Sequence, residues 1–292
     1  MATRRQPFNV PRIFHTATLL TNGTVLIAGG QSAEEIGQSS TEIYNPSTNQ
    51  WTLGASLLQG RDSHSATLLP DGRVLVAGGE GECPDQHGLC VLASAEIYDS
   101  ATNQWSMTGH MHVRRENHTA TLLPNGQVLV VGGTNALAPS QYKIAVCELY
   151  DPSAGTWSVT GEMSVRRSEF TANLLPNGQV LVAGGGGTKT SAMLVPRESH
   201  ASALLPEGQV LIMGGTGKDC TPLCNVLGSA EIYDPNTGAW TAAPSMHRRR
   251  WARRATTLPS GLVLVEGGVN TEAWDAPPMA EAETYQRAPD GN

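Results

Sequence analysis

The sequence predicts an all-β protein made of repeated antiparallel sheets, and three observations lead to that prediction. A phrase of sixteen residues recurs six times, and a second phrase, in which Tyr precedes Trp by seven residues, occurs four times. Glycine and proline supply 32 and 18 of the 292 residues, which is typical of a chain with many turns. Apolar residues make up 39% of the chain, so it has enough apolar side chains to fold around a core.

The first phrase predicts a β-hairpin. In the third copy it reads HTATLLPNGQVLVVGG, from His118 to Gly133, and the Pro-Asn-Gly turn joins two short apolar strands. The copies run over 15–30, 64–79, 118–133, 170–185, 200–215 and 253–268. Their final glycines are separated by 49, 54, 52, 30 and 53 residues, so four intervals are close to 50 and one is short.

The second phrase predicts two further strands joined by another turn. It occupies Thr41–Trp51, Ala95–Trp105, Cys147–Trp157 and Ala230–Trp240. Together the two phrases make a unit of four antiparallel strands that repeats about every 50 residues, which is the pattern of a β-propeller blade. Six first phrases predict six blades.

The double glycine, the Tyr and the Trp at these spacings resemble the kelch repeat. The resemblance covers nearly the whole chain, and the phrases are similar to the bacterial kelch variety and to the propeller of galactose-oxidase-like proteins. It implies one kelch-type propeller domain over residues 1–292.

Two repeats depart from the pattern. Seven residues after Tyr285 the sequence reaches Asn292 in place of Trp, so the last blade lacks its fourth strand, and we expect the segment Ala2–Val10 to supply it and close the ring. Between Gly185 and His200 the second phrase is missing, which reduces blade 4 to about two strands. This shortening is either a tolerated deletion or a lateral binding notch.

One arginine recurs in every repeat, nine residues before the turn proline or, in the first repeat, before Thr21. These residues are Arg12, Arg61, Arg115, Arg167, Arg197 and Arg250. Arranged around a channel they would bind carboxylate or phosphate, and the resemblance implies the same use, since arginines at this mouth bind acidic peptides in kelch modules. The alternative is that they pair with the third-strand glutamates, which are Glu42, Glu96, Glu148, Glu231 and Glu283.

The loop that enters the sixth repeat, HRRRWARR, places five arginines around Trp251. With Tyr142 and Trp274 expected on the same face, it predicts contacts with an acidic peptide or a glycan. Acidic residues of other loops on that face could instead simply balance its charge. The net charge of −7 disfavours nucleic acid and anionic membrane as partners, and we expect a monomer.

No cofactor or metal is expected. His15, His64, His118 and His200 begin the inner strands, and their repeated position indicates hydrogen-bonded structural residues more than a metal site. The sequence lacks the iron motif and the tyrosine–cysteine crosslink signature of enzymes among kelch relatives. A binding module for a protein, peptide or glycan is therefore predicted; the alternative is an enzyme of the sialic-acid mutarotase or copper-radical-oxidase kind.

Four cysteines lie in pairs in equivalent loops. We expect Cys83 to bond Cys90 and Cys220 to bond Cys224, although a zinc site shared by the two loops is an alternative. Disulfides would indicate a secreted or periplasmic protein, and a cytoplasmic location stays open.

Overall fold

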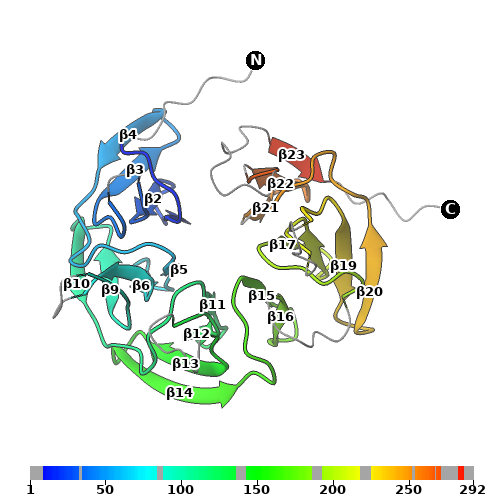
Figure 1. Cartoon of the computed structure of the whole chain (residues 1–292). Coiled ribbons are helices and arrows are strands. Elements are labelled where there is room, and N and C mark those ends of the chain that lie inside the picture. Colours follow the sequence, from blue (N-terminus) through cyan, green and yellow to red (C-terminus); the bar gives the residue numbers. More distant parts are fainter. Residues whose placement is uncertain are drawn as a thin grey trace. The chain divides into compact units, whose positions relative to one another are not determined.

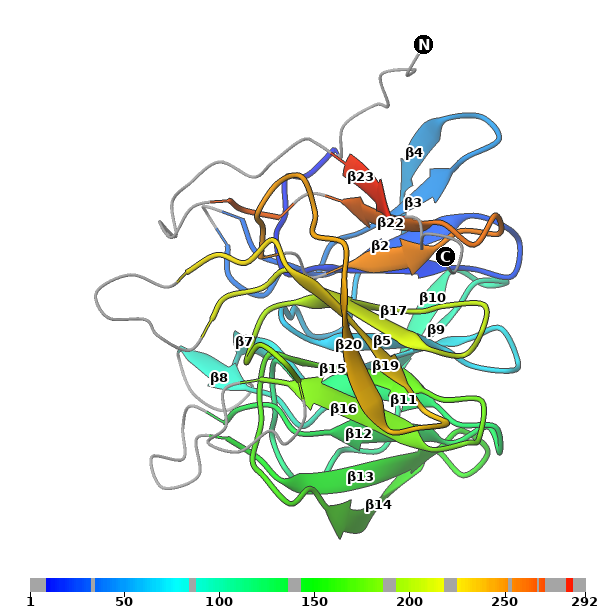
Figure 2. The same cartoon turned by 90° about the vertical axis from the view of Figure 1, so that its right-hand side faces the viewer.

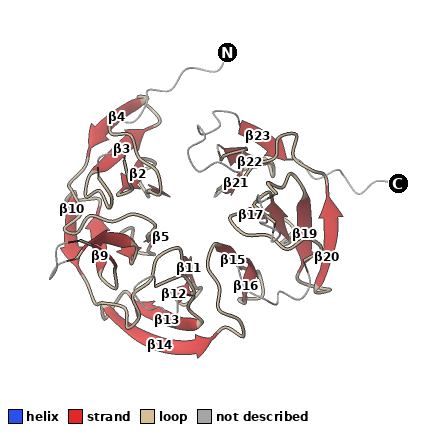
Figure 3. Cartoon of the chain, viewed as in Figure 1, coloured by secondary structure: helices blue, strands red, loops and turns tan. Residues whose placement is uncertain are grey.

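The computed structural model describes residues 9–32, 35–83, 88–135, 143–185, 193–217, 225–251, 254–266, 268–270 and 282–285. In these parts the regular structure is all strand, and no helix is present (Figure 3). The chain divides into two compact units, Met1–Arg166 and Arg167–Asn292. The prediction of an all-β chain is confirmed.

The first unit contains three four-stranded antiparallel sheets, with orders β1-β2-β3-β4, β5-β6-β9-β10 and β11-β12-β13-β14 (Figure 1). The first sheet consists of β1 (Thr16–Leu19), β2 (Val25–Ala28), β3 (Thr41–Asn45) and β4 (Gln50–Leu53). The second consists of β5 (Ser65–Leu68), β6 (Val74–Ala77), β9 (Ala95–Asp99) and β10 (Gln104–Met107). The third consists of β11 (Thr119–Leu122), β12 (Val128–Val131), β13 (Val146–Asp151) and β14 (Thr156–Glu162). A separate hairpin pairs β7 (Glu80–Glu82) with β8 (Leu89–Val91) (Figure 2).

The second unit contains sheets of two, four and three strands. The fourth repeat forms only β15 (Phe170–Leu174) and β16 (Val180–Gly184). The fifth forms β17 (Ala201–Leu204), β18 (Val210–Met213), β19 (Ala230–Asp234) and β20 (Ala239–Ala243). The sixth forms β21 (Ala255–Thr257), β22 (Val263–Glu266) and β23 (Ala282–Tyr285). Residues 2–8 of the proposed closing strand lie outside the described residues, and complete six-bladed closure is not confirmed.

The strand register explains the spacing of Tyr and Trp. Across β3 and β4, Tyr44 is opposite Trp51, and their ring centroids are 4.8 Å apart. The same cross-strand pair recurs in the other complete sheets, with centroid distances of 5.0, 5.0 and 5.1 Å. Tilted aromatic rings at this separation attract each other and bury a large apolar area. The seven-residue interval thus spans the turn and the strand ends on both sides of it, which brings the two rings together.

The double glycine permits a close approach between neighbouring repeats. Gly78 has a φ of 64°, and a Cβ there would lie 2.4 Å from the carbonyl oxygen of Arg115 in the next repeat. The next residue, Gly79, donates its N–H to that same oxygen at 2.9 Å. A side chain would therefore clash with the backbone of the next repeat and prevent this contact.

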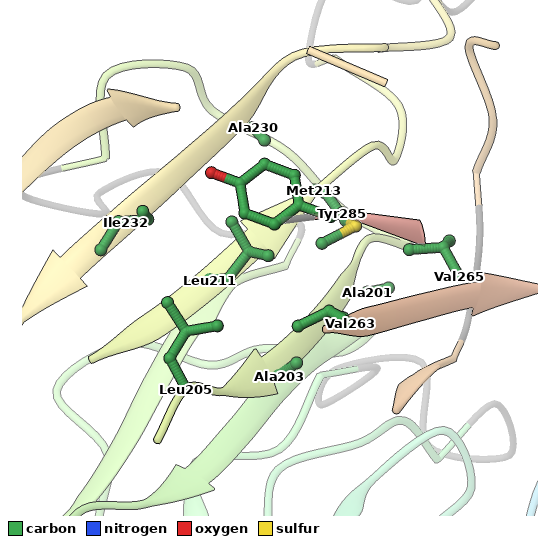
Figure 4. Close-up of a cluster of buried hydrophobic side chains, with 10 residues drawn as sticks. All are labelled: Ala201, Ala203, Leu205, Leu211, Met213, Ala230, Ile232, Val263, Val265 and Tyr285. Atoms are coloured by element: carbon green, nitrogen blue, oxygen red, sulfur yellow. The ribbon is translucent and has the colours of Figure 1, made fainter. Parts of the chain in front are cut away.

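The apolar core lies between adjacent sheets of each unit. In the second unit, buried residues of the fifth sheet, including Leu211 and Met213, pack against Val263, Val265 and Tyr285 of the sixth (Figure 4). In the first unit, Leu75 and Ala77 of the second sheet pack with Val128 and Val130 of the third. Within each unit, alternating inward-facing side chains thus join adjacent sheets.

Candidate functional site

The arginine that recurs in each repeat is bound within its own sheet. Arg61 donates from Nη1 to the carbonyl oxygens of Gly78 (2.8 Å) and Ser94 (3.1 Å), and from Nη2 to Oε1 of Glu96 (2.8 Å). Glu96 also accepts the backbone N–H groups of Leu58 (2.7 Å) and Gln59 (3.1 Å). Both ionic side chains are fully buried. This network ties the incoming loop to the third strand.

Five of the six predicted arginines form this pair. The distances from Nη2 to the glutamate Oε1 are 3.2 Å for Arg12–Glu42, 2.8 Å for Arg61–Glu96, 2.8 Å for Arg115–Glu148, 2.6 Å for Arg197–Glu231 and 2.5 Å for Arg250–Glu283. Burial lowers the pKa of Arg61 and Arg115, and their glutamate partners oppose that effect. Pairing with the third-strand glutamate, the alternative stated above, is therefore what the structure contains at these five positions.

Arg167 is different because its sheet has no third strand. It is half-buried, and its Nη1 donates to the carbonyl oxygen of Gly184 at 2.8 Å. No carboxylate of the described residues pairs with it, and burial lowers the pKa of its guanidinium without an opposing acid. Arg167 thus occupies the structural position of the other five while lacking their anionic partner.

The loop that enters the sixth repeat presents exposed cations. The backbone N–H groups of His247 and Arg248 donate to Glu283 at 2.7 and 3.1 Å, and Arg250 is buried on the same carboxylate. The side chains of residues 247–249 are exposed, and Trp251 is half-buried. The other two predicted aromatic contacts, Tyr142 and Trp274, lie outside the described residues.

Three of the recurrent histidines bond the first strand of the preceding repeat. Nε2 of His64 lies 2.9 Å from Oγ1 of Thr16, and the equivalent atoms of His118 and His200 lie 2.9 Å from Ser65 and 3.0 Å from Thr171. Burial lowers the pKa of His118 and of His200 to about 3, and the nearby arginines Arg115 and Arg197 add to the effect. His118 and His200 are therefore neutral at neutral pH.

The predicted bond between Cys83 and Cys90 is not formed in this structure, where both residues are free thiols. The hairpin nevertheless holds them near each other, since Cys83 donates its N–H to Gly88 at 2.9 Å and Cys90 pairs with Gly81. Burial and the neighbouring Cys83 thiol raise the pKa of Cys90 to about 11, so it is protonated at neutral pH. The second predicted pair, Cys220 and Cys224, lies outside the described residues.

A shallow recess that the sequence did not indicate lies among the hairpin turns of the first unit. Its volume is about 420 Å³, and it is lined by Pro70, Asp71, Arg73 and residues 125–127 and 151–153. Arg73 is paired with Asp71 at 2.7 Å, so the recess offers little unsatisfied charge. Among the described residues no group of three or more His, Cys, Asp or Glu side chains could hold a metal ion. The same residues contain no helix long and apolar enough to span a membrane.

Comparison with known proteins agrees with this repeat structure. The sequence profile of the Kelch motif family matches residues 14–58 and 199–247. The chain is 24% identical over 170 residues to "Kelch repeat-containing protein kel-10" of Caenorhabditis elegans, covering 58% of this chain and 28% of that protein. It is 29% identical over 144 residues to "F-box/kelch-repeat protein At1g67480" of Arabidopsis thaliana, covering 49% of this chain and 29% of that protein.

A third relative, "Kelch-like protein 23" of Mus musculus, is 27% identical over 186 residues, covering 63% of this chain and 30% of that protein. The matched region therefore spans about three tenths of the length of these relatives. Among solved structures, one titled "Structure of YjhT" aligns with a TM-score of 0.70 at 14% identity, over 94% of this chain and 95% of the other. At this identity the likeness concerns the fold alone, which is a β-propeller.

Proposed function

We propose that this chain, which is a kelch-repeat β-propeller protein, is a binding module that recognises an acidic segment of another protein through the loop entering the sixth repeat. The observation that carries the proposal is the contrast within this loop. Arg250 is buried on Glu283, whereas the neighbouring Arg248 and Arg249 have exposed side chains. The Arg250–Glu283 pair anchors the loop, and the exposed side chain of Arg249 lies where a ligand can reach it.

The chemistry of this loop favours a carboxylate-bearing ligand. Arginine forms two parallel hydrogen bonds with a carboxylate, and these charge-assisted bonds are stronger than neutral ones. Trp251, which is half-buried beside them, offers an apolar ring surface for a peptide or a sugar. A glycan with an acidic sugar is the second ligand that these groups suit.

The ring of six arginines stays a prediction as a ligand site. Because five of its members are held by glutamates, four of them buried, the proposal gives ligand contact to Arg248, Arg249 and Trp251 instead. Tyr142 and Trp274 keep their predicted role as further aromatic contacts.

We also propose the finer architecture derived from the sequence, in which six blades form a ring and residues 2–10 complete the sixth. The N–H groups of Asn9 and Val10 donate to Glu42 at 2.9 and 3.1 Å, which supports an ordered path for the end of this segment. Deleting residues 1–8 should lower the melting temperature by many degrees. An unchanged melting temperature would contradict the closure.

A secreted or periplasmic location and a monomeric state are proposals as well. Oxidative expression should join Cys83 to Cys90, and the mass of the unreduced protein should then be lower by two hydrogen atoms, whose electrons pass to the oxidant. Five free thiols after such expression would count against both the pairing and the location. Sedimentation would test the monomer.

The binding function is tested with a peptide library rich in Asp and Glu and an array of sialylated glycans. Binding should weaken with salt, because exposed charges are screened, and Arg249→Ala should lower the affinity at least tenfold. The matched control is Arg73→Ala, which removes an exposed arginine of the first unit. An affinity that changes neither with salt nor with Arg249→Ala would contradict the proposed site. Stoichiometric copper or iron in the purified protein would favour the alternative of an enzyme.

A further inference from the structure

The two-stranded fourth sheet lacks the third strand and with it the glutamate that every other sheet supplies to its arginine. In the other five sheets the third strand places a glutamate opposite the second-strand residue that is three positions before the final glycine. These pairs are Ile27–Glu42, Val76–Glu96, Val130–Glu148, Ile212–Glu231 and Val265–Glu283. By the same count the equivalent residue of β16 is Val182. Among the described residues no strand pairs with this side of β16.

Arg167 lies where the missing glutamate would be bound. Like the other arginines it donates from Nη1 to the carbonyl oxygen of the first glycine of the pair, Gly184. Arg197, its neighbour in the fifth repeat, donates in addition to the carbonyl oxygen of Ser229 and to Glu231. Both of these further acceptors belong to or adjoin the third strand. The guanidinium of Arg167 therefore keeps its remaining N–H groups for an acceptor that the described residues do not provide.

The chain segment that follows β16 contains no carboxylate side chain for Arg167. Residues 186–192 read GGTKTSA and contain neither Asp nor Glu. The nearby Glu169 is engaged by the hydroxyl of Ser199. A carboxylate for Arg167 must therefore come from elsewhere.

A second feature beside the same edge is incomplete as well. In the second and third sheets the Trp of the fourth strand donates its indole N–H to a carbonyl of the preceding repeat, from Trp105 to Ala55 at 2.9 Å and from Trp157 to Gly109 at 2.8 Å. Both carbonyls follow the fourth strand of that preceding repeat. Trp240 follows a repeat that has no such strand. It is half-buried, packs against the buried cluster that contains Ala183 of β16, and has no equivalent bond among the described residues.

We propose that the open edge of β16 binds an extended segment of another protein as an added antiparallel strand, with a glutamate of that segment opposite Val182 and on Arg167. An exposed sheet edge offers unpaired backbone groups that a peptide strand can join, and side-chain sites along the edge give the specificity. The register of the other five sheets sets the partner sequence. In each of them a valine of the second strand, two positions before the residue that faces the glutamate, is opposite a Tyr of the third strand. The partner should therefore contain Glu, an apolar residue and an aromatic residue in succession.

This site is separate from the loop of the sixth repeat and does not depend on the function proposed for it. The probe is a labelled peptide of residues 230–240, AEIYDPNTGAW, which carries the required Glu-Ile-Tyr. Fluorescence anisotropy with the full chain should give saturable binding. The peptide with Gln in place of its Glu should bind at least tenfold more weakly, and amide exchange should become slower at residues 180–184.

Two protein variants separate this site from the loop. Arg167→Ala should lower the affinity for the peptide at least tenfold, and Arg249→Ala should leave that affinity unchanged. For acidic ligands of the loop, Arg249→Ala should lower the affinity and Arg167→Ala should not. Arg167→Lys, which keeps the charge but not the planar fork, should be intermediate. Equal binding of the Glu and Gln peptides to the native chain would overturn the proposal, and this comparison does not depend on how the Arg167 variants fold. Slower amide exchange at strands other than β16 would also overturn the proposal. So would a dimer of the free chain that the peptide dissociates, because the edge would then be occupied by a second copy of the chain.

Discussion

Arg61 and Glu96 form a buried ion pair, with Nη2 and Oε1 2.8 Å apart, that joins the loop entering the second repeat to the third strand of its sheet. The glutamate also binds two backbone N–H groups of that loop, so a single carboxylate satisfies three donors. Because a buried charge is costly unless paired and hydrogen-bonded, each partner needs the other. The pair fixes where one repeat ends and the next begins.

Glu96→Gln should therefore destabilise the protein by about 3–5 kcal/mol, because it leaves the Arg61 charge buried and unpaired. The matched control is Asp71→Asn, which breaks an exposed pair with Arg73 and should cost less than about 1 kcal/mol. Urea unfolding measures both. Similar losses for the two variants would contradict the assignment of Glu96 as a buried structural charge.

Arg167→Met should cost less stability than Arg197→Met. Arg197 is bound by Glu231 and by two carbonyl oxygens, and its removal leaves a buried carboxylate without its cation. Arg167 is half-buried and releases only the carbonyl of Gly184. We expect a difference of at least about 2 kcal/mol between the two variants. An equal loss in urea unfolding would indicate that Arg167 has a structural partner.

The buried histidines make stability depend on pH. Burial lowers the pKa of folded His118 and His200 to about 3, below the value of about 6.5 in an unfolded chain, so between these values the unfolded chain binds more protons. Their contribution is complete above pH 6.5 and decreases as the pH falls toward 3. Each histidine should reduce the free energy of unfolding by about 1.4 kcal/mol per pH unit in this window.

Unfolding of the native chain at pH 7 and pH 5 tests this expectation, with His118→Gln as the variant and exposed His110→Gln as the control. The first substitution should reduce the pH dependence, and the second should leave it as it is. A native chain equally stable at both pH values would show that the histidines do not titrate on unfolding as expected.

Gly78→Ala tests the close approach between repeats. Its φ of 64° is strained for alanine, and the added Cβ would lie 2.4 Å from the carbonyl oxygen of Arg115. We expect a loss of at least about 2 kcal/mol. Gly161→Ala is the control, because nothing lies within 4 Å of a Cβ there. A mild effect at Gly78 would mean that the repeats can move apart at little cost.

The sequence predicted the hairpins and placed Tyr and Trp on two strands joined by a turn, because both follow from local rules of turn residues and strand alternation. Tyr98 and Trp105, for example, are opposite each other as the seven-residue interval requires. The arginines were harder to interpret, since Arg is normally an exposed residue and a recurrent one suggests a ligand site as readily as an internal pair. Their burial results from the packing of loop against sheet, which no single strand pattern reveals.

Two further features escaped prediction for similar reasons. Among the described residues the second repeat alone forms two strands at this place, β7 and β8, so the repeat pattern gave no template for this hairpin. The missing strands of the fourth repeat were predicted from their absent phrase. The consequence for Arg167 was not, because it depends on the glutamates that the other sheets place on their arginines.

Trp157→Phe and Trp240→Phe compare a four-stranded sheet that follows another four-stranded sheet with one that follows the two-stranded fourth repeat. Each substitution keeps the aromatic contact with the opposite Tyr, whose ring centroid is 5.0 Å away for Trp157 and 5.1 Å for Trp240. Of these two residues, only Trp157 donates its indole N–H to a carbonyl of the preceding repeat within the described part of the chain, at 2.8 Å. Trp157→Phe should therefore cost about 1 kcal/mol more, because it leaves the Gly109 carbonyl without that donor. The difference is measured by urea unfolding. A larger loss of stability for Trp240→Phe would show that the Trp240 side chain is already held by a partner within the chain. That partner would also leave less of the β16 edge for an added strand.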